Sequence, residues 1–573
     1  MNKGLFMIKL PSSILFLLTF ATQATFAIDY ISPTPFKAEH AISPVVKSYH
    51  YPVITWGDSI LAVDNKALFP NGIKVVDNPN QQLQNLVDGK TPFLRQTVGS
   101  GVMLIDALEE IGVEMEVFHS VTDSYGGDVI VARGIKNIDE LKAKLDAGET
   151  VTIAIQFGGP HMGMLVELLH SIGHNLADKS VEIKYTKNLF DKGSAEEAIA
   201  TDKSIDLAFV IAPGAANLTS GEYAIPDVKV LTSTKVMSNS IKDVIFVRSD
   251  WAKENRSKLK KIREAFLASK SNLLNSSKVK EASKLLFGDS SAQSIADLEG
   301  LRDDARFHSL KASNNFLYSS TNLNNFSKKV SKLVGQYVKV GLISHKNLEI
   351  GVTDWNVKPS QKVTVRDVSP QIASKITQEV IKLDDAGQGE VLMSSNIHFQ
   401  PNQSVFSEKK YGADFKKAIE NAATYGGAVF KIVGNTDPML LRAWNKAVDF
   451  KEHKNIGGLK KVSRYLSKVS DRNIDLSKMS IQLIKTERNQ IREAGIRTSK
   501  QRANAVKSSI ITYAKGHGMD IDASRLVVLG VGGENPIFEK PRSKVEFRKN
   551  IRVEFELTNY NSEISEFTQA QDF

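Results

Sequence analysis

The sequence predicts an α/β protein made of two modules: a two-lobed α/β module over residues 46–358, and an α+β domain with a helical insertion over residues 389–558. The length of 573 residues is too great for one hydrophobic core. Short apolar runs alternate with helical segments in the first module, and strand and helix patterns resume near Gly389 after a proline-flanked stretch. Further expected boundaries are a second lobe at about residues 136–245, a linker over 359–388 and a disordered tail over 559–573.

The first module supplies strand and helix patterns in a regular order. Apolar runs predict strands near residues 53–56, 114–118, 128–132, 152–156, 181–185 and 206–210. Helical spacing predicts helices over 100–111, 137–145, 162–172 and 251–268. Ser100 is well placed to cap the first of these helices.

The N-terminus has the pattern of a secretory signal. Lys3 and Lys9 precede an apolar run over residues 14–21, and small residues follow up to Ala27. The run is shorter than the ~20 residues that span a bilayer, so we expect cleavage after Ala27 rather than a retained anchor. The mature chain is therefore expected in an extracytoplasmic space, which makes nucleic acid a poor candidate partner.

The composition restricts the chemistry of the chain. With 42% hydrophobic and 24% charged residues it is typical of a globular protein, and the absence of cysteine excludes disulfides, thiolate zinc sites and cysteine nucleophiles. The sequence holds no HExxH, no phosphate-binding P-loop and no G-x-S-x-G motif. We therefore expect a protein that is not an enzyme and that uses no metal and no cofactor.

The best candidate ligand loop is Phe157-Gly158-Gly159-Pro160-His161, between a predicted strand and a predicted helix. Glycines let backbone N–H groups approach a ligand, and the start of a helix favours an anion. A tight turn without a ligand explains the same glycines. Together with Thr55-Trp56-Gly57, residues 123–132 and residues 242–248, this order of segments resembles the periplasmic solute-binding proteins of nitrate, taurine and aliphatic-sulfonate ABC importers.

This resemblance implies a type II periplasmic-binding-protein fold, in which two lobes enclose a small-molecule solute, and an ABC permease as a further partner. The ligand-binding residues it implies are Trp56, Ser100, Asp123, Ser124, Phe157, Gly158, Gly159 and Pro213. Asp123 would repel an anion unless it pairs with an amine, which leaves a zwitterion or an organic amine open. Trp56 and Phe157 are equally compatible with plain core positions.

Two motifs mark the second module. Gly434-Asn435-Thr436-Asp437 ends an apolar run, and Ser499-Lys500-Gln501-Arg502-Ala503 is expected to open a helix, with Ser499 as its cap. With a closing strand over 550–557 they resemble the OmpA-like domain. The resemblance implies that Asp437 and Arg502 bind the ammonium and carboxylate of diaminopimelate in peptidoglycan, supported by Thr436, Asn550 and Arg552. It also implies association with peptidoglycan or the outer membrane.

The two motifs lie further apart than this family requires, which indicates an insertion at about residues 440–497. Residues 445–500 hold fourteen Lys or Arg against six Asp or Glu. Such a basic segment suits weak contact with a membrane surface or an anionic polymer, and it equally suits a solvated helical face. Apolar residues at helical spacing predict added helices there.

Together these features predict a peptidoglycan-tethered solute-binding protein of the periplasm that serves an ABC importer. The alternative is a wall-anchored sensory or protein-interaction module that uses the bilobal fold without transport. A third reading, an enzyme on the same scaffold, has no supporting motif.

Overall fold

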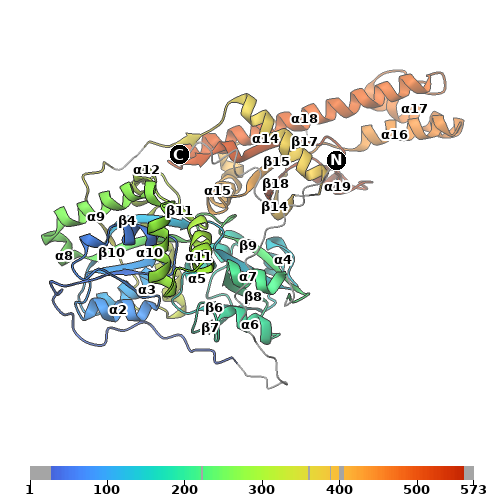
Figure 1. Ribbon diagram of the computed structural model, residues 1–573. Coiled ribbons are helices and arrows are strands. Elements are labelled where there is room, and N and C mark those ends of the chain that lie inside the picture. The colour runs from blue at the N-terminus through green and yellow to red at the C-terminus, as the bar shows by residue number, and fades with distance from the viewer. Residues whose placement is uncertain (1–27, 221–223, 359–361, 388, 399–405, 561–573) are drawn as a thin grey trace. The chain divides into compact units, whose positions relative to one another are not determined.

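The computed structural model describes residues 28–220, 224–358, 362–387, 389–398 and 406–560 (Figure 1). The expected signal segment 1–27 and residues 561–573 of the expected tail lie outside the described residues. The chain forms two compact units, which we call unit 1 (Met1–Gln361 with Thr424–Gly426) and unit 2 (Lys362–Ala423 with Gly427–Phe573). Within the described residues, every helix is too short or too polar to cross a membrane.

The first lobe of unit 1 is built on a five-stranded sheet in the order β11-β4-β10-β3, with β12 paired to β4. Its strands are β3 (Phe93–Thr97), β4 (Met115–Ser124), β10 (Lys242–Arg248), β11 (Ala305–Phe307) and β12 (Gly351–Val352). A separate parallel pair is formed by β1 (Tyr51–Val53) and β2 (Ile73–Val75). Buried aromatic rings, among them Tyr51, Phe93 and Phe118, form the core against this sheet.

Helices surround this sheet. They are α1 (Ser59–Asp64), α2 (Pro79–Val87), α3 (Val98–Glu109), α8 (Ser249–Glu254), α9 (Arg256–Ala268), α10 (Ser276–Phe287), α11 (Ala292–Asp303), α12 (Leu310–Tyr318) and α13 (Phe326–Tyr337). The single helix expected over 251–268 is two helices that meet at Asn255. The expected cap at Ser100 is also wrong: Thr97 is the N-cap of α3 and its side chain accepts from the Ser100 N–H, because the helix begins at Val98.

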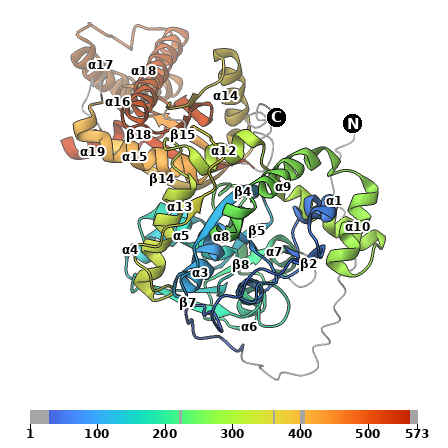
Figure 2. The same cartoon turned by 90° about the vertical axis from the view of Figure 1, so that its left-hand side faces the viewer.

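The second lobe has its own five-stranded sheet in the order β7-β6-β8-β5-β9. Its strands are β5 (Asp128–Arg133), β6 (Val151–Gln156), β7 (Val181–Thr186), β8 (Leu207–Ile211) and β9 (Val228–Ser233). Its helices are α4 (Ile138–Asp146), α5 (His161–Ile172), α6 (Ala195–Thr201) and α7 (Ala212–Thr219). The chain enters this lobe from β4 and returns to the first lobe at β10, so two crossings join the lobes (Figure 2).

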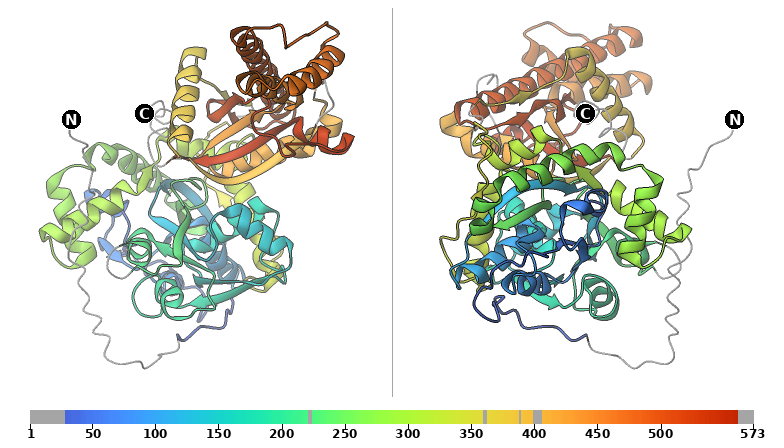
Figure 3. Two further views of the ribbon diagram at one scale, coloured as in Figure 1. Left: turned by 90° about the vertical axis from the view of Figure 1, so that its right-hand side faces the viewer. Right: turned by 60° about the vertical axis from the view of Figure 1, so that its left-hand side comes forward.

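Unit 2 contains a four-stranded sheet in the order β14-β18-β15-β17. The strands are β14 (Glu390–His398), β15 (Val429–Gly434), β17 (Leu526–Gly530) and β18 (Arg552–Asn559); α15 (Glu408–Thr424) and α19 (Lys544–Asn550) complete the domain (Figure 3). β15 is parallel to β17 and antiparallel to β18. A short pair joins β13 (Val365–Arg366) to β16 (Ile521–Asp522).

The expected linker over 359–388 is largely folded. It contains β13 and α14 (Pro370–Asp385), and the Ile376, Val380 and Leu383 side chains of α14 pack against Val429 and Val527 of the sheet. The apolar face of α14 explains why this segment belongs to unit 2 rather than to a free connector.

The segment 440–497 forms α16 (Met439–Glu452), α17 (Ile456–Ser470) and the first half of α18 (Ile481–Gly516). These helices share a core that includes Trp444, Leu459, Leu466 and Ile484. Ser499 therefore lies inside a 36-residue helix, and Ser480 is its N-cap. The expected cap at Ser499 is wrong because residues 481–498 contain no proline to interrupt the helix.

Candidate functional site

Trp56 and His161 approach the same stretch of backbone from opposite lobes. Trp56 follows β1 in the first lobe, and a Cβ atom added to Gly127 would lie 2.5 Å from its ring. His161 begins α5 in the second lobe, and its Nε2 lies 2.7 Å from Asp128 Oδ1. Residues 127 and 128 stand where the chain enters the second lobe. The junction between the lobes therefore gathers an indole and an imidazole.

Both rings carry polar atoms without hydrogen-bond partners. Within the described part of the chain, Trp56 Nε1 and His161 Nδ1 are buried and make no hydrogen bond, and His161 Nε2 has only the carboxylate of Asp128 beside it. The close contact of His161 with Asp128 lacks hydrogen-bond geometry. An unsatisfied buried donor costs about 1–3 kcal/mol. The junction thus holds donor and acceptor capacity that a small molecule can satisfy.

A hollow of about 530 Å³ opens beside this junction. Its walls combine Tyr125 and Gly126 of the crossing segment with Ala212 of α7, Lys235 and Asp304. Burial, with help from Asp128 and Asp303, raises the pKa of Asp304 to about 6. The hollow is therefore small, partly apolar and lined by groups of both charges.

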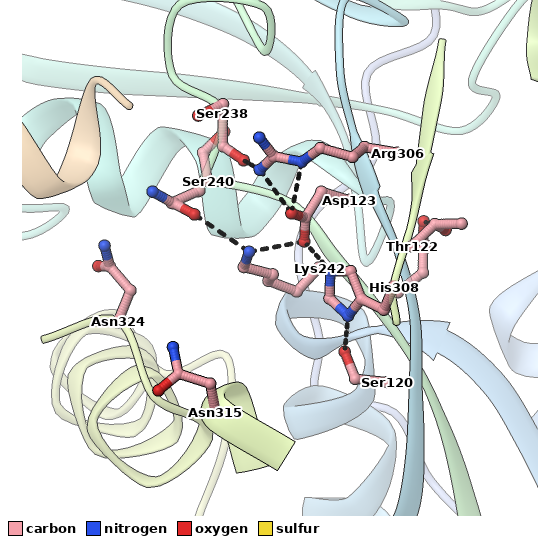
Figure 4. A network of polar contacts seen from close by, with 12 residues as sticks. Ser120, Thr122, Asp123, Ser238, Ser240, Lys242, Arg306, His308, Asn315 and Asn324 are labelled. Atoms are coloured by element: carbon pink, nitrogen blue, oxygen red, sulfur yellow. Dashed lines mark hydrogen bonds and ion pairs between the residues drawn. The ribbon is translucent and has the colours of Figure 1, made fainter. Parts of the chain in front are cut away.

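Asp123, which the sequence suggested as a ligand contact, is neutralised by the protein itself. Its carboxylate lies 2.6 Å from Lys242 Nζ, 2.6 Å from Arg306 Nη2 and 2.8 Å from His308 Nε2. Figure 4 shows the carboxylate between these three side chains. The sheet register brings them together, because Lys242 and Arg306 are the cross-strand neighbours of Asp123 on β10 and β11.

The pKa values of this cluster follow from burial and pairing. Burial would raise the pKa of Asp123, but His308, Lys242 and Arg306 hold it well below its usual range. Burial lowers the pKa of Lys242 to about 8, although Asp123 opposes that shift, and burial also lowers the pKa of His308. Because the charge of Asp123 is balanced by these partners, its carboxylate does not rule out an anionic ligand nearby.

Ser100 and Ser124 serve local structure. The Ser100 hydroxyl lies 3.1 Å from the Thr97 hydroxyl at the start of α3. The Ser124 hydroxyl lies 2.8 Å from that of Thr234, which also accepts from the Gly126 N–H and so ties the two crossings together. Both serines are buried. Ser124 lies close to the hollow, because Thr234 also contacts Gly126, which is one of the lining residues.

The glycine loop after β6 is covered by the chain's own N-terminal segment. Phe36 packs on Phe157 with ring centroids 5.2 Å apart, and a Cβ on Gly158 would lie 2.5 Å from the Phe36 ring. Gly158 has a φ of +64°, and a Cβ on Gly159 would meet the Gln156 side chain at 2.2 Å. The loop therefore needs both glycines for its turn and its packing.

The starts of α3 and α5 also pack against each other. A Cβ on Gly99 would lie 2.8 Å from the Gly163 backbone nitrogen. Pro213, in contrast, is exposed in the first turn of α7. None of the eight residues expected in the cleft lines the hollow itself; Ser124 and Pro213 are chain neighbours of its lining residues Tyr125 and Ala212, and Trp56 packs near Gly127, whereas Ser100 and the 157–159 loop lie in packed regions.

In unit 2, the loop after β15 is fixed by contacts from three directions. The Asn435 N–H donates to the Arg552 carbonyl at 2.9 Å, and the Thr436 N–H donates to the Gly532 carbonyl at 2.8 Å. A Cβ on Gly434 would lie 2.0 Å from the Ser499 carbonyl oxygen of α18. The loop that carries Asp437 therefore begins where β15 packs against Ser499 of α18, the helix that also carries Arg502.

Asp437 and Arg502 are both half-buried and oppositely charged. Burial raises the pKa of Asp437, against a hydrogen bond from the Met439 N–H, and burial lowers the pKa of Arg502. Each charge is thus disfavoured by its surroundings.

Asn550 and Arg552 hold the neighbouring loop. The Asn550 side chain accepts from the Phe538 N–H and donates to its carbonyl, both at 2.8 Å. Arg552 Nε donates to Glu554 at 2.8 Å and its Nη2 donates to the Asn535 carbonyl at 3.1 Å. Both side chains are buried, so they shape the site rather than line it.

The helical insertion reaches this site. Burial and the nearby carboxylate of Asp437 raise the pKa of Tyr465, which belongs to α17. The sequence predicted the insertion but not its approach to Asp437. His161 belonged to the predicted ligand loop without being named as a binding residue, and Asp304 and Tyr465 were not predicted as site residues. One feature of the sequence pointed to His161, namely its position directly after Gly-Gly-Pro. No feature of the sequence pointed to Asp304, because only the folded structure brings it close to Gly126 and Gly127. Within the described residues, no cluster of three or more His, Asp or Glu side chains is arranged to hold a metal ion.

Comparison with known proteins gives similarity to solved structures only. No family model matches the chain, and no curated protein matches it. The alkanesulfonate-binding protein SsuA from Xanthomonas axonopodis pv. citri bound to MOPS is similar at 13% identity and a TM-score of 0.38, over 53% of this chain and 96% of that one. The periplasmic aliphatic sulphonate binding protein SsuA from Escherichia coli is similar at 15% identity and a TM-score of 0.39, over 53% of this chain and 95% of that one.

The periplasmic nitrate-binding protein NrtA from Synechocystis PCC 6803 is similar at 11% identity and a TM-score of 0.37, over 52% of this chain and 83% of that one. These similarities cover about half of the chain and are to periplasmic solute-binding proteins. The two-lobed fold of unit 1 follows from its own sheets and does not depend on them.

Proposed function

We propose that the chain is a periplasmic solute-binding protein tethered to peptidoglycan. Unit 1 captures a small organic zwitterion at the junction of its lobes, and unit 2 holds the protein on the cell wall. The observation that carries the proposal is the set of buried, unpaired nitrogens of Trp56 and His161 beside a hollow of about 530 Å³. Polar atoms of this kind are rare in folded proteins unless a ligand or water satisfies them.

The lining of the hollow supports the class of solute. Asp303 and Asp304 offer carboxylates to an ammonium group, and Lys235 offers a cation to an anionic group. The raised pKa of Asp304 means that its charge is costly when it is alone. An ammonium-bearing solute removes that cost, and the Tyr125 ring and Ala212 accommodate a short apolar body.

The test is native mass spectrometry of residues 28–573 purified gently from the periplasm, followed by release and identification of any bound molecule. We expect one small zwitterion per chain, lost in Trp56→Phe and weakened in Lys235→Gln. Lys229→Gln removes the same charge at an exposed position of β9 and should leave binding unchanged. A chain that arrives empty, and whose melting temperature no amino-acid-like solute shifts, contradicts solute capture.

The proposed tether rests on the strand order β14-β18-β15-β17 and on two half-buried, oppositely charged residues, Asp437 in the loop after β15 and Arg502 in α18. Arginine binds a carboxylate through two parallel hydrogen bonds, and aspartate accepts from an ammonium. We expect the mature chain to sediment with purified sacculi, and Arg502→Ala to stay in solution. Arg497→Ala, on an exposed part of the same helix, is the matched control. Equal sedimentation of both variants would contradict the proposed tether.

A second candidate function is a wall-anchored sensory or protein-interaction module. The direct packing of Gly99 on Gly163 and the cover of Phe36 over Gly158 favour it, because both fill space that a cleft would use. It predicts no bound solute in the mass spectrometry experiment and no solute-dependent shift in melting temperature. Delivery to an ABC permease applies only to the first candidate.

A further inference from the structure

The helical insertion of unit 2 builds a hollow of its own. Its volume is about 520 Å³, and its walls come from α16, the first half of α18 and the loop at residues 533–539. Pro438, which follows Asp437 directly, lines one side, and Gly533 lines another. A Cβ on Gly533 would lie 3.0 Å from the Asp437 carbonyl oxygen. The hollow is therefore continuous with the loop that carries Asp437.

Three arginines line this hollow: Arg442 from α16 and Arg488 and Arg492 from α18. Arg492 pairs with Glu534, whereas Arg488 donates to its chain neighbour Asn489 at 2.7 Å. Arg442 lies 3.7 Å from Glu539, a side chain that is 79% exposed. The Nη1 atom of Arg442 is buried and has no hydrogen-bond partner among the described residues.

The charges of this hollow are incompletely balanced. Among the side chains that line the hollow, two glutamates, Glu534 and Glu539, stand against three guanidinium groups, and Glu493, outside the lining, lies 3.9 Å from Arg492. Guanidinium groups bind planar anions with paired hydrogen bonds, and carboxylate matches that geometry. The unpaired Nη1 of Arg442 gives such an anion a ready donor.

We propose that this hollow is a second subsite, which binds a carboxylate of the peptide stem while Asp437 and Arg502 bind the diaminopimelate end. This inference rests on the proposed tethering function and extends it to a longer part of the stem. It assigns a role to the insertion: α16, α17 and α18 lengthen the binding surface beyond the loop of residues 434–437. Tyr465 of α17 lies close enough to Asp437 for that carboxylate to raise its pKa, so the insertion reaches the Asp437 loop.

The test is calorimetric titration of the mature chain, residues 28–573, with three probes: diaminopimelate, the stem tripeptide Ala-Glu-diaminopimelate, and the dipeptide Ala-Glu. We expect the tripeptide to bind at least about tenfold more tightly than diaminopimelate, as one added charged hydrogen bond provides. Arg442→Ala should remove that gain and leave diaminopimelate binding unchanged. Arg488→Ala is the second variant, in case loss of the buried Arg442 side chain impairs folding.

Arg464→Ala is the matched control, because Arg464 is exposed on α17 and lies outside the lining of the hollow. Equal tripeptide affinity in the parent, Arg442→Ala and Arg488→Ala chains overturns the subsite while diaminopimelate binding still supports the tether. Failure of diaminopimelate and tripeptide alike overturns the tether and the subsite together. Inorganic phosphate is titrated as a fourth probe, and phosphate binding without any binding of Ala-Glu overturns the carboxylate assignment.

Discussion

Asp123 and Lys242 face each other across β4 and β10, with the carboxylate and the ammonium 2.6 Å apart at the point where the chain passes between the lobes. Arg306 completes the arrangement from the other side, on β11. The carboxylate and both cations are held in or beside the sheet of the first lobe. The cluster therefore fixes the geometry of the crossing, and its charges are balanced within the protein.

We predict that Asp123→Asn destabilises unit 1 by roughly 3–5 kcal/mol, because it leaves buried Lys242 and Arg306 without their counter-charge. Urea unfolding followed by tryptophan fluorescence measures this loss. The control is Asp227→Asn, which breaks a surface pair with Arg133 and should cost less than about 1 kcal/mol. Similar losses in the two variants would show that the buried cluster contributes no more than a surface ion pair.

Asp304 is predicted to make unit 1 less stable as pH rises from about 4 to 6. Its folded pKa, about 6, lies above the ordinary value of 3.8, so the folded state binds the extra proton in that interval. The stabilisation is complete below pH 3.8 and disappears as pH rises through 6. Asp304→Asn should therefore raise stability at pH 7 by about 3 kcal/mol and change nothing at pH 3.5.

Scanning calorimetry at the two pH values checks this prediction. Glu299→Gln, at an exposed position of α11, serves as the control and should change stability little at either pH. Stabilisation by Asp304→Asn that is equal at pH 3.5 and pH 7 would contradict a raised pKa at Asp304.

Gly99→Ala is predicted to destabilise unit 1 by about 1–3 kcal/mol, because its Cβ would lie 2.8 Å from the Gly163 nitrogen and neither backbone can move easily. Gly335→Ala gives the opposite expectation. Gly335 lies in α13 with nothing within 4 Å of an added Cβ, so alanine should stabilise that helix by about 0.5–1 kcal/mol. Thermal unfolding of both variants measures the contrast, and a harmless Gly99→Ala would show that α3 and α5 separate readily.

The alternation of strands and helices in unit 1 was accessible from sequence because apolar periodicity is local. The partners of Asp123 were not, since Arg306 stands 183 positions away and only sheet register pairs them. The same limit hid Asp304. Ser499 shows a different failure: the family motif suggested a helix start, but the uninterrupted helical sequence before it carried α18 back to Ile481. Local sequence patterns predict single helices and strands. The close contact of Gly434 with Ser499 depends on the tertiary fold, so local patterns could not predict it.

Asp437→Asn is predicted to separate stability from wall binding. Burial raises the pKa of Asp437, so its charge opposes folding slightly at neutral pH, and a neutral amide of the same shape should leave unfolding unchanged or shift it upward by less than about 1 kcal/mol. The amide cannot balance an ammonium, so sedimentation with sacculi should fall at least about tenfold. Asp449→Asn, exposed on α16, should change neither property. Loss of binding together with a large loss of stability would instead mark Asp437 as a turn residue whose role is to hold the loop after β15.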